Sequence, residues 1–275
     1  MKEINPEEPN HLKPLIEIIK LCIASAWVKN ERPVNLLISS KPESGKTFVL
    51  QLFSQIPKTA YLTDCTAYGI MKNLLADIET GNLRFIIIPD LIKPLSRKHS
   101  TVSDFIAFMN ALIEEGVVTI FTYAIQIQRK NLKCGLITSL PSGELLDRRR
   151  RWIKLGFMSR MIPFTYSFNQ EFVDFIFEQI QQRKYIDYKP IILKLEEREV
   201  EITPEQAKVL EPEARIIGKA QELYGFRAQR QLQNLAQANA LLENRKFVTD
   251  EDIQKIKWLS KWINFDFNPL ESLPL

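Results

Sequence analysis

The sequence predicts an α/β fold in which helices cover both faces of a mostly parallel sheet, followed by an all-helical second domain. Short apolar runs alternate with helical patterns as far as Tyr166, and helical patterns dominate after it. Strands of a parallel sheet are buried on both faces, so they read as continuous apolar runs. The composition fits this class, because 45% of the 275 residues are hydrophobic and 25% are charged. It excludes a disordered chain, a collagen-like chain and a bundle of membrane helices.

The first part of the chain supplies the expected sheet. Apolar residues from Leu15 to Ala26 recur at helical spacing, and the apolar run after Pro33 is typical of a buried strand. The run before Pro89 is the clearest strand, and Gly116 ends a helix that precedes a hairpin. In chain order we expect helix 12–28, strand 34–38, helix 48–54, strand 59–63, helix 70–78, strand 84–88, helix 104–115, a hairpin from 117–122 and 124–129, and strands 134–138 and 162–166.

The second part supplies the helical domain. Thr203 begins its best-defined helix, because a capping Thr is followed by Pro204 and, three residues after the cap, by Gln206. Further helices are expected at 168–183, 213–223, 229–242 and 250–262, with a small hairpin from 191–195 and 200–202. The chain is therefore expected to divide into an N-terminal segment with an amphipathic helix (1–32), an αβα core (33–167) and a helical domain (168–275).

A candidate phosphate-binding loop lies between the first strand and the next helix. The P-loop pattern is Gly, four residues, then Gly-Lys-Ser/Thr, and the chain departs from it only at the first position, which is Ser. In such a loop backbone N–H groups point at phosphate oxygens, the lysine neutralises the β and γ phosphates, and the last hydroxyl binds Mg²⁺. ATP and Mg²⁺ are therefore the expected cofactors. The loop residues are Ser40, Lys41, Pro42, Glu43, Ser44, Gly45, Lys46 and Thr47.

One acid, Asp90, follows the clearest strand. P-loop ATPases place an acid there to hold Mg²⁺ through water, and many add a glutamate that polarises the attacking water. Asp90 is either the metal-side acid, with Leu91 in place of the glutamate, or it stands in the glutamate position with Pro89 in place of the aspartate. Both registers predict slow hydrolysis unless a carboxylate comes from elsewhere.

The ordered set of motifs resembles an AAA+ ATPase, and within that class the minichromosome maintenance helicase branch, which has a hairpin before sensor 1. The resemblance covers residues 33–262. Besides the P-loop and the acid-tipped strand, it is carried by residues 111–120 and 121–141 for the hairpin and sensor 1, 156–161 (Gly-Phe-Met-Ser-Arg-Met) for the arginine-finger motif, 230–240 for the sensor 2 helix and 246–252 for the closing segment of the lid.

The resemblance implies roles for individual residues. Thr138 or Ser139 would be sensor 1, which bonds the attacking water or the γ-phosphate. Arg160 would be the arginine finger that reaches a nucleotide held by the neighbouring subunit, since a planar, always-charged fork suits a phosphoryl group in its transition state. Arg230, or Arg227 in its place, would be sensor 2 on the lid.

The resemblance also implies a nucleic-acid surface. Arg129, Lys130 and Lys133 lie on the expected hairpin, which in the resembling helicases faces a central DNA channel. In a ring of subunits they would follow phosphates without reading sequence. Residues 93–160 hold twelve Lys or Arg and five Asp or Glu, a net charge of +7, against +4 for the whole chain. This local charge is compatible with an anionic partner and also with a solvated surface.

The leading hypothesis is an oligomeric AAA+ ATP hydrolase, expected to form a hexameric ring, with ATP at each subunit interface and single- or double-stranded DNA as its partner. It would be a helicase-like or translocase-like motor, or a loader, with phage or plasmid replication as a candidate setting. The alternative is a hydrolysis-poor assembly switch that recruits a protein partner when ATP is bound, which the single carboxylate favours.

A cytoplasmic protein without a membrane span is expected. The apolar stretch 15–28 contains Glu17 and Lys20 and is too short to cross a bilayer, and nothing before it resembles a signal peptide. Three cysteines and two histidines are too few for a disulfide framework or a histidine-centred metal site. Few cysteines are typical of a reducing compartment.

Overall fold

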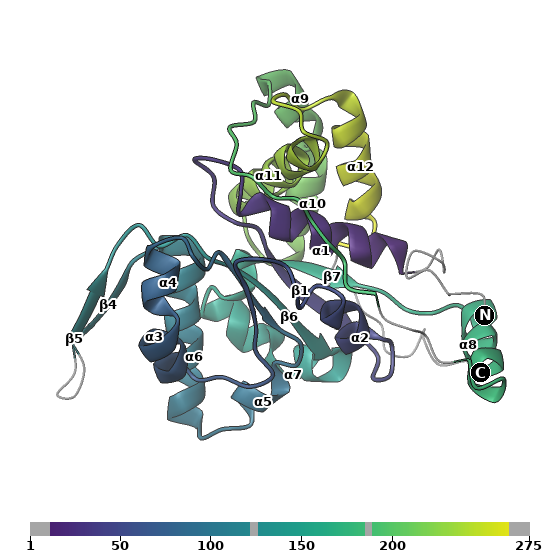
Figure 1. Cartoon of the computed structure of the whole chain (residues 1–275), viewed down its shortest axis with the longest axis horizontal. Helices are drawn as coiled ribbons and strands as arrows, with labels where there is room; N and C mark the ends of the chain where they lie inside the picture. The colour runs from purple at the N-terminus through teal and green to yellow at the C-terminus, as the bar shows by residue number, and fades with distance from the viewer. Residues whose placement is uncertain (1–11, 122–125, 185–188, 264–275) are drawn as a thin grey trace.

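The computed structural model describes residues 12–121, 126–184 and 189–263. Figure 1 shows a central sheet with helices around it, a helical lid above it, and a hairpin and helix α8 that project to opposite sides. The predicted α/β fold with a helical second domain is confirmed. None of the described helices is both long and apolar enough to cross a membrane.

The central sheet has five parallel strands in the order β2-β3-β6-β1-β7. The strands are β1 (Asn35–Ser40), β2 (Thr59–Tyr61), β3 (Phe85–Ile88), β6 (Gly135–Pro141) and β7 (Met161–Thr165). The middle of β1 pairs with both neighbours, so that Leu36 lies beside Ile137 of β6 and Ile162 of β7. Because all five strands are parallel, the carboxyl ends of β1, β3 and β6 meet at one edge of the sheet.

Side chains that alternate along the strands build an apolar core on each face of the sheet. Ile38 belongs to the core on the face that the lid covers, and Leu37 to the core on the other face. On the lid side lie α1 (Lys13–Ser25) and α2 (Lys46–Gln51). On the other side lie α3 (Ala67–Asn73), α4 (Leu75–Glu79), α5 (Ile92–Leu95), α6 (His99–Asn110) and α7 (Ser142–Lys154).

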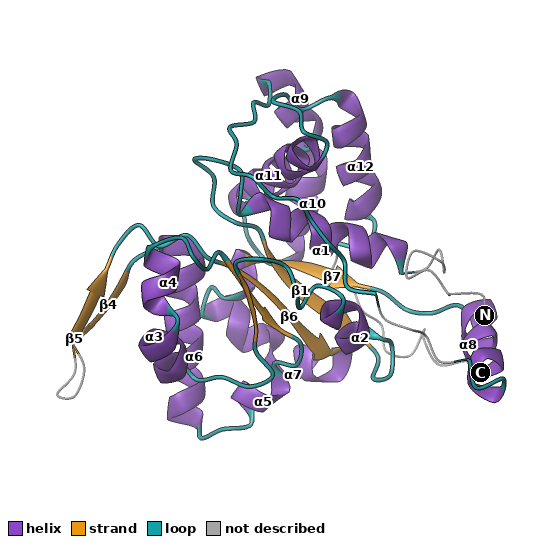
Figure 2. Ribbon diagram, in the orientation of Figure 1, coloured by secondary structure: helices purple, strands orange, loops and turns teal. Residues whose placement is uncertain are grey.

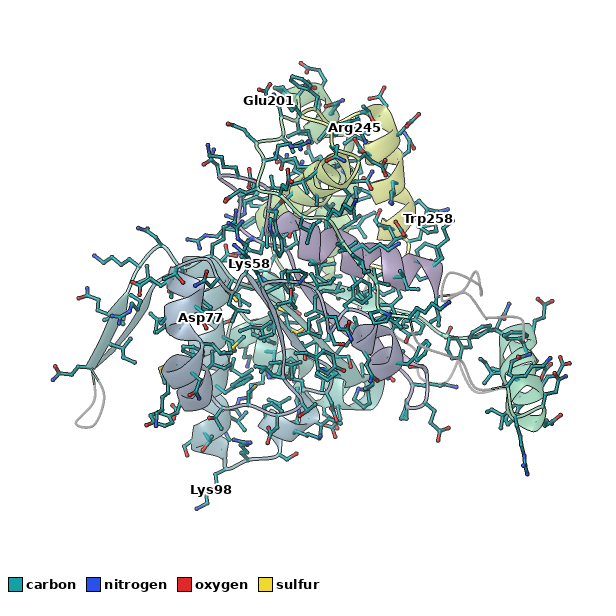
Figure 3. The ribbon with its side chains drawn as sticks, in the orientation of Figure 1. Lys58, Asp77, Lys98, Glu201, Arg245 and Trp258 are labelled. Atoms are coloured by element: carbon teal, nitrogen blue, oxygen red, sulfur yellow. The ribbon has the colours of Figure 1, made fainter. Side chains whose placement is uncertain are left out.

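The lid consists of short helices and one long one, coloured purple with the other helices in Figure 2. They are α9 (Pro204–Val209), α10 (Glu211–Ala220), α11 (Phe226–Leu242) and α12 (Asp250–Ser260), and α8 (Gln170–Gln181) precedes them. The predicted cap of α9 is confirmed, because Thr203 and Gln206 form a reciprocal capping box. Figure 3 marks the top of the lid with Arg245 and the side of α12 with Trp258.

The N-terminal helix α1 belongs to the core that the lid and the sheet share. It packs against α11, and ten of its residues are buried, where an amphipathic helix would bury one face. Helix α1 therefore lies inside this core.

Two expectations for local structure are wrong. Residues 191–202 do not pair with each other, because their backbone bonds elsewhere: Arg198 exchanges bonds with Trp27 and Lys29, and Glu201 bonds to Lys246 and Val248. The single helix expected over residues 70–78 is divided into α3 and α4 at Leu74. The hairpin is confirmed as β4 (Val118–Phe121) and β5 (Gln126–Arg129), with a π-helical turn, Ala111–Glu115, before it.

Candidate nucleotide-binding site

The candidate phosphate loop joins β1 to α2 at the carboxyl edge of the sheet. Gly45 has φ of +79°, a left-handed conformation that L side chains rarely adopt, and it sets the direction in which α2 begins. Lys46 is the first residue of α2, and Thr47 follows with an exposed side chain. Pro42 and Glu43 are exposed at the outer turn. The local sequence therefore folds as the P-loop pattern predicts.

The ammonium group of Lys46 is held by oxygen atoms of the loop itself. Its Nζ donates to the carbonyl oxygens of Lys41 (2.6 Å) and Ser40 (3.2 Å), and to the hydroxyl oxygens of Ser40 (3.2 Å) and Ser44 (3.1 Å). Burial lowers the pKa of Lys46 to about 8, although the nearby charge of Asp90 acts to raise it. The structure thus brings the predicted lysine and the predicted acid into one electrostatic site.

Ser40, which replaces the first glycine of the pattern, takes part in the hydrogen bonds of the loop. Its hydroxyl bonds to the hydroxyl of Ser44 and accepts from Lys46. Glycine could make neither contact, because both use the side chain. The departure from the pattern therefore adds polar contacts inside the loop.

Tyr166, the residue directly after β7, forms a hydrogen bond with the backbone of the loop. Its buried hydroxyl donates to the carbonyl oxygen of Ser44 at 2.8 Å. Burial raises the pKa of Tyr166, so its hydroxyl remains a donor at neutral pH. No local sequence pattern assigns Tyr166 a role, since only the pairing of β7 with β1 brings it to the loop.

Asp90 lies just beyond the end of β3. Its Oδ1 accepts a hydrogen bond from the backbone N–H of Ile92 at 2.9 Å, which fixes the carboxylate at the start of α5. Leu91 is fully buried in the core below the sheet, and Pro89 is also buried. Asp90 is therefore the residue of this segment that presents a carboxylate beside the phosphate loop.

The two sensor 1 candidates differ in their contacts. The hydroxyl of Ser139 donates to the carbonyl oxygen of Pro89 at 2.6 Å, and this bond ties the end of β6 to the end of β3. The buried Oγ1 of Thr138 has no hydrogen-bond partner among the described residues. A buried polar atom without a partner is uncommon, and it is a candidate contact for a ligand or a water molecule.

A divalent cation at this edge would fit the residues present. Thr47 and Asp90 offer two oxygen ligands, and the described part of the chain holds no group of three or more His, Cys, Asp or Glu side chains that could bind a metal by itself. Mg²⁺ commonly takes one or two protein ligands and completes its shell with phosphate and water oxygens. The residues thus suit an ion that arrives with a nucleotide.

Arg160 lies at the opposite edge of the sheet. It precedes β7, whose first residue pairs with Asn35 at the start of β1, whereas the phosphate loop follows the end of β1. The six residues of β1 separate these edges by about 17 Å. Nη1 of Arg160 donates to the carbonyl oxygen of Gly156 at 2.6 Å, and Nη2 lies 3.4 Å from Oε1 of Glu115.

The lid arginines lie beside Arg160, and the structure does not bring them to the phosphate loop of the same chain. Arg230 Nη2 lies 2.6 Å from Oε1 of Glu114, and Arg227 Nε lies 3.4 Å from the same atom. Arg227 also donates from Nη1 to the hydroxyl of Ser159, the neighbour of Arg160, at 3.0 Å. The three predicted arginines therefore form one group, which we call the arginine cluster (Arg160, Arg227 and Arg230).

The three basic residues predicted for the hairpin separate in the structure. Arg129 ends β5, where it forms an exposed ion pair with Glu79 at 2.9 Å, and Lys130 is exposed beside it. Lys133 lies beyond the hairpin and is half-buried; its Nζ donates to the carbonyl oxygen of Val28 at 2.6 Å. Only Arg129 and Lys130 of this set are presented on an exposed surface.

Comparison with known proteins supports the interpretation of the helical domain. Residues 220–257, from the end of α10 through α11 and into α12, match the family model of the AAA lid domain. A search of curated proteins found no match. In this chain the segment that matches the AAA lid domain follows a parallel αβα core, and the candidate phosphate loop of that core follows β1, the neighbour of the edge strand β7.

Proposed function

We propose that the chain is an ATP-hydrolysing motor or loader that acts on nucleic acid, with each ATP–Mg²⁺ held between two copies of the chain. The phosphate loop would bind the triphosphate through its backbone N–H groups and Lys46, and Thr47 and Asp90 would hold the metal ion. Asp90, whose carboxylate lies near Lys46, would act in the first of the two registers, with Leu91 in the glutamate position. Thr138, whose buried hydroxyl lacks a partner, is the better candidate to bond the attacking water.

The observation that carries this proposal is the position of the arginine cluster. Its members lie at the far edge of the sheet from the phosphate loop, about 17 Å away along β1. An arginine side chain cannot span that distance to a nucleotide in the same chain. A second copy whose phosphate loop faces the cluster would receive the guanidinium groups that stabilise charge during phosphoryl transfer. Such contacts repeated head to tail generate a ring or a filament.

The proposal is tested by mixing two inactive variants. Lys46→Ala should lose ATP binding, and Arg160→Ala should bind ATP but hydrolyse it about 10³-fold more slowly than the wild type. In an equal mixture, about a quarter of random interfaces would combine an intact Lys46 with an intact Arg160, so steady-state ATPase activity should return. Each variant alone is the control. A mixture as inactive as its components, although it assembles, would contradict a role of Arg160 across the interface.

The second candidate function is a nucleotide-dependent assembly switch. It is favoured by the buried Leu91 beside Asp90, because the usual second carboxylate is then absent from the sequence at this point. ATPase rates with and without single-stranded DNA separate the two functions. Marked stimulation by DNA supports the motor, whereas tight ATP binding with negligible turnover supports the switch.

A further inference from the structure

The root of the hairpin is fixed by contacts from distant parts of the chain. Leu132 N donates to the carbonyl oxygen of Gly116 at 2.9 Å and closes the root. Arg32 spans both sides of it, with Nη1 donating to the carbonyl oxygen of Leu132 at 2.5 Å and Nη2 to that of Glu115 at 3.0 Å. The carbonyl oxygen of Arg32 accepts from Nδ2 of Asn234 in α11. The lid thus contacts the hairpin root through Arg32.

Glu114 provides a second and more direct connection. It stands in the π-helical turn Ala111–Glu115, immediately before the hairpin, and its side chain is only 15% exposed. Oε1 of Glu114 lies 2.6 Å from Nη2 of Arg230 and 3.4 Å from Nε of Arg227, and both arginines belong to the lid. The two arginine side chains are 44% and 45% exposed, so solvent screens these pairs in part, while the carboxylate itself is largely shielded. Glu114 therefore joins the lid helix α11 to the hairpin root.

The same two arginines belong to the cluster that would reach a phosphate on the neighbouring subunit. A guanidinium fork binds a carboxylate and a phosphate with the same donors and the same planar geometry. Donors that are directed at Glu114 are not available to a phosphate at the same time. Glu114 contacts Nε of Arg227 and Nη2 of Arg230. A phosphate that engages these same nitrogens would compete with Glu114 for both arginines.

We propose that Glu114 is a positioning residue that holds Arg227 and Arg230 on the hairpin root, and that a nucleotide phosphate on the neighbouring subunit displaces it. Nucleotide binding at the interface would then release one of the contacts between lid and hairpin, and the hairpin root would loosen. The displacement step rests on the proposed function, whereas the holding of the root by Glu114 does not.

Hydrogen exchange at the amides of Gly116 and Leu132 tests the holding step without nucleotide. Glu114→Gln keeps the shape of the side chain but removes its charge, and we expect exchange at both amides to become about five- to tenfold faster, as loss of a charge-assisted hydrogen bond would give. Glu144→Gln is the matched control, since Glu144 pairs with Arg148 at 2.7 Å on α7, away from the hairpin. Unchanged exchange in Glu114→Gln would overturn the proposal.

A second variant guards against a local folding defect. Arg230→Gln removes the same ion pair from the lid side, and it should accelerate exchange at Gly116 and Leu132 to a similar extent. Acceleration in Glu114→Gln without acceleration in Arg230→Gln would show that the carboxylate acts on its own helical turn, and the proposal would fail.

The displacement step is tested with a non-hydrolysable ATP analogue and Mg²⁺. In the wild type, exchange at the two amides should rise toward the Glu114→Gln rate, while Glu114→Gln itself should show no further increase. Binding of a fluorescent form of the analogue is measured in the same samples. If the analogue binds but hydrogen exchange at the two amides does not change, the displacement step is wrong, while the holding step and the proposed function stand. Failure of the wild type to bind the analogue contradicts the proposed function and, with it, the displacement.

Discussion

At the scale of single residues, the phosphate loop is held by hydrogen bonds between its own residues and by one hydrogen bond from Tyr166. Lys46 bonds to four oxygen atoms of the loop, and Tyr166 bonds to the carbonyl oxygen of Ser44. A phosphate would have to draw the ammonium group of Lys46 away from these oxygen atoms. Burial makes the charged form of this lysine unusually easy to lose, because it lowers the pKa to about 8.

This pKa predicts a pH dependence for ATP binding. Below about pH 8 Lys46 is already charged, so affinity should vary little with its titration. Above about pH 8 the free protein loses the proton, whereas a bound phosphate favours the charged form, so binding must take up a proton and the Kd should rise by up to about tenfold per pH unit. Calorimetry between pH 7 and 9.5 measures the affinity and the proton uptake.

Lys46→Arg is the control for this prediction, since arginine stays charged throughout the range. It should bind ATP with little dependence on pH. A wild-type profile as flat as that of Lys46→Arg would show that the titration of Lys46 does not govern binding.

Sequence alone predicted the residues of the loop but not the group that supports it. Gly45, Lys46 and Thr47 form a local pattern, so their conformation follows from neighbouring residues. Tyr166 lies far along the chain, and its contact depends on the register of β7 against β1. A local sequence pattern does not predict how β7 pairs with β1.

At the scale of elements, an ion pair between the buried Asp252 and the partly exposed Arg245 fixes the beginning of α12. Asp252 is fully buried and accepts hydrogen bonds from both terminal nitrogens of Arg245, at 2.7 Å each, and from Thr249 N at 2.7 Å. Burial alone would raise the pKa of Asp252, but these bonds more than offset it and the pKa is lowered. The ionised carboxylate therefore stabilises the lid.

Asp252→Asn should lower the free energy of unfolding at pH 7 by about 3 kcal/mol, because it leaves Arg245 without its buried partner. A carboxylate with a lowered pKa stabilises the fold above the unfolded pKa of about 4, and this contribution is lost as the pH falls through that value toward the folded pKa. The difference between variant and wild type should therefore shrink between about pH 5 and 3. Urea unfolding at several pH values measures it.

Asp250→Asn is the matched control, because Asp250 is exposed in the first turn of the same helix. Its expected cost is about 0.5 kcal/mol. If both variants lose the same free energy of unfolding, the ion pair with Arg245 stabilises the lid no more than an exposed charge in the first turn of α12 does.

The helices of the lid were predictable where a capping residue marks their first turn. Thr203 and Thr249 are capping residues, and both of their helices begin at the expected residue. Helix α7, which holds the arginine run from Arg148 to Arg151, was not predicted. Charge without apolar periodicity carries little information about secondary structure.

At the scale of the whole molecule, the hairpin projects away from the body (Figure 1), and its exposed basic residues are Arg129 and Lys130. If the hairpin contacts nucleic acid, the double variant Arg129→Gln/Lys130→Gln should weaken DNA binding at all sequences alike. The slope of log K against log salt should become less negative by up to about 2 for duplex DNA, one unit for each lost phosphate contact. Titrations at several salt concentrations measure this slope.

Lys133→Gln is the control, since the ammonium group of Lys133 is occupied by the carbonyl oxygen of Val28. Its salt slope should equal that of the wild type. A slope that changes in Lys133→Gln, but not in the double variant, would place the nucleic-acid contact elsewhere.

The arrangement of the arginine cluster could not be predicted from sequence. A helix pattern predicts that α11 exists, and the family resemblance predicts a role for Arg227 or Arg230, but neither gives the angle at which the lid lies over the sheet. That angle is set by the packing of α11 on α1 and by contacts such as that of Gln231 with the carbonyl oxygen of Arg160. These contacts join residues that are far apart in sequence.

The burial of α1 has a consequence for how the protein is made. This helix precedes α11, the helix it packs against, by about 200 residues, so it is synthesised well before its partner. Contacts between residues so far apart in the chain slow folding, because a long loop must close before they form. The surface of α1 that packs on α11 therefore stays uncovered until the lid has been synthesised, and a lid expressed without α1 should aggregate.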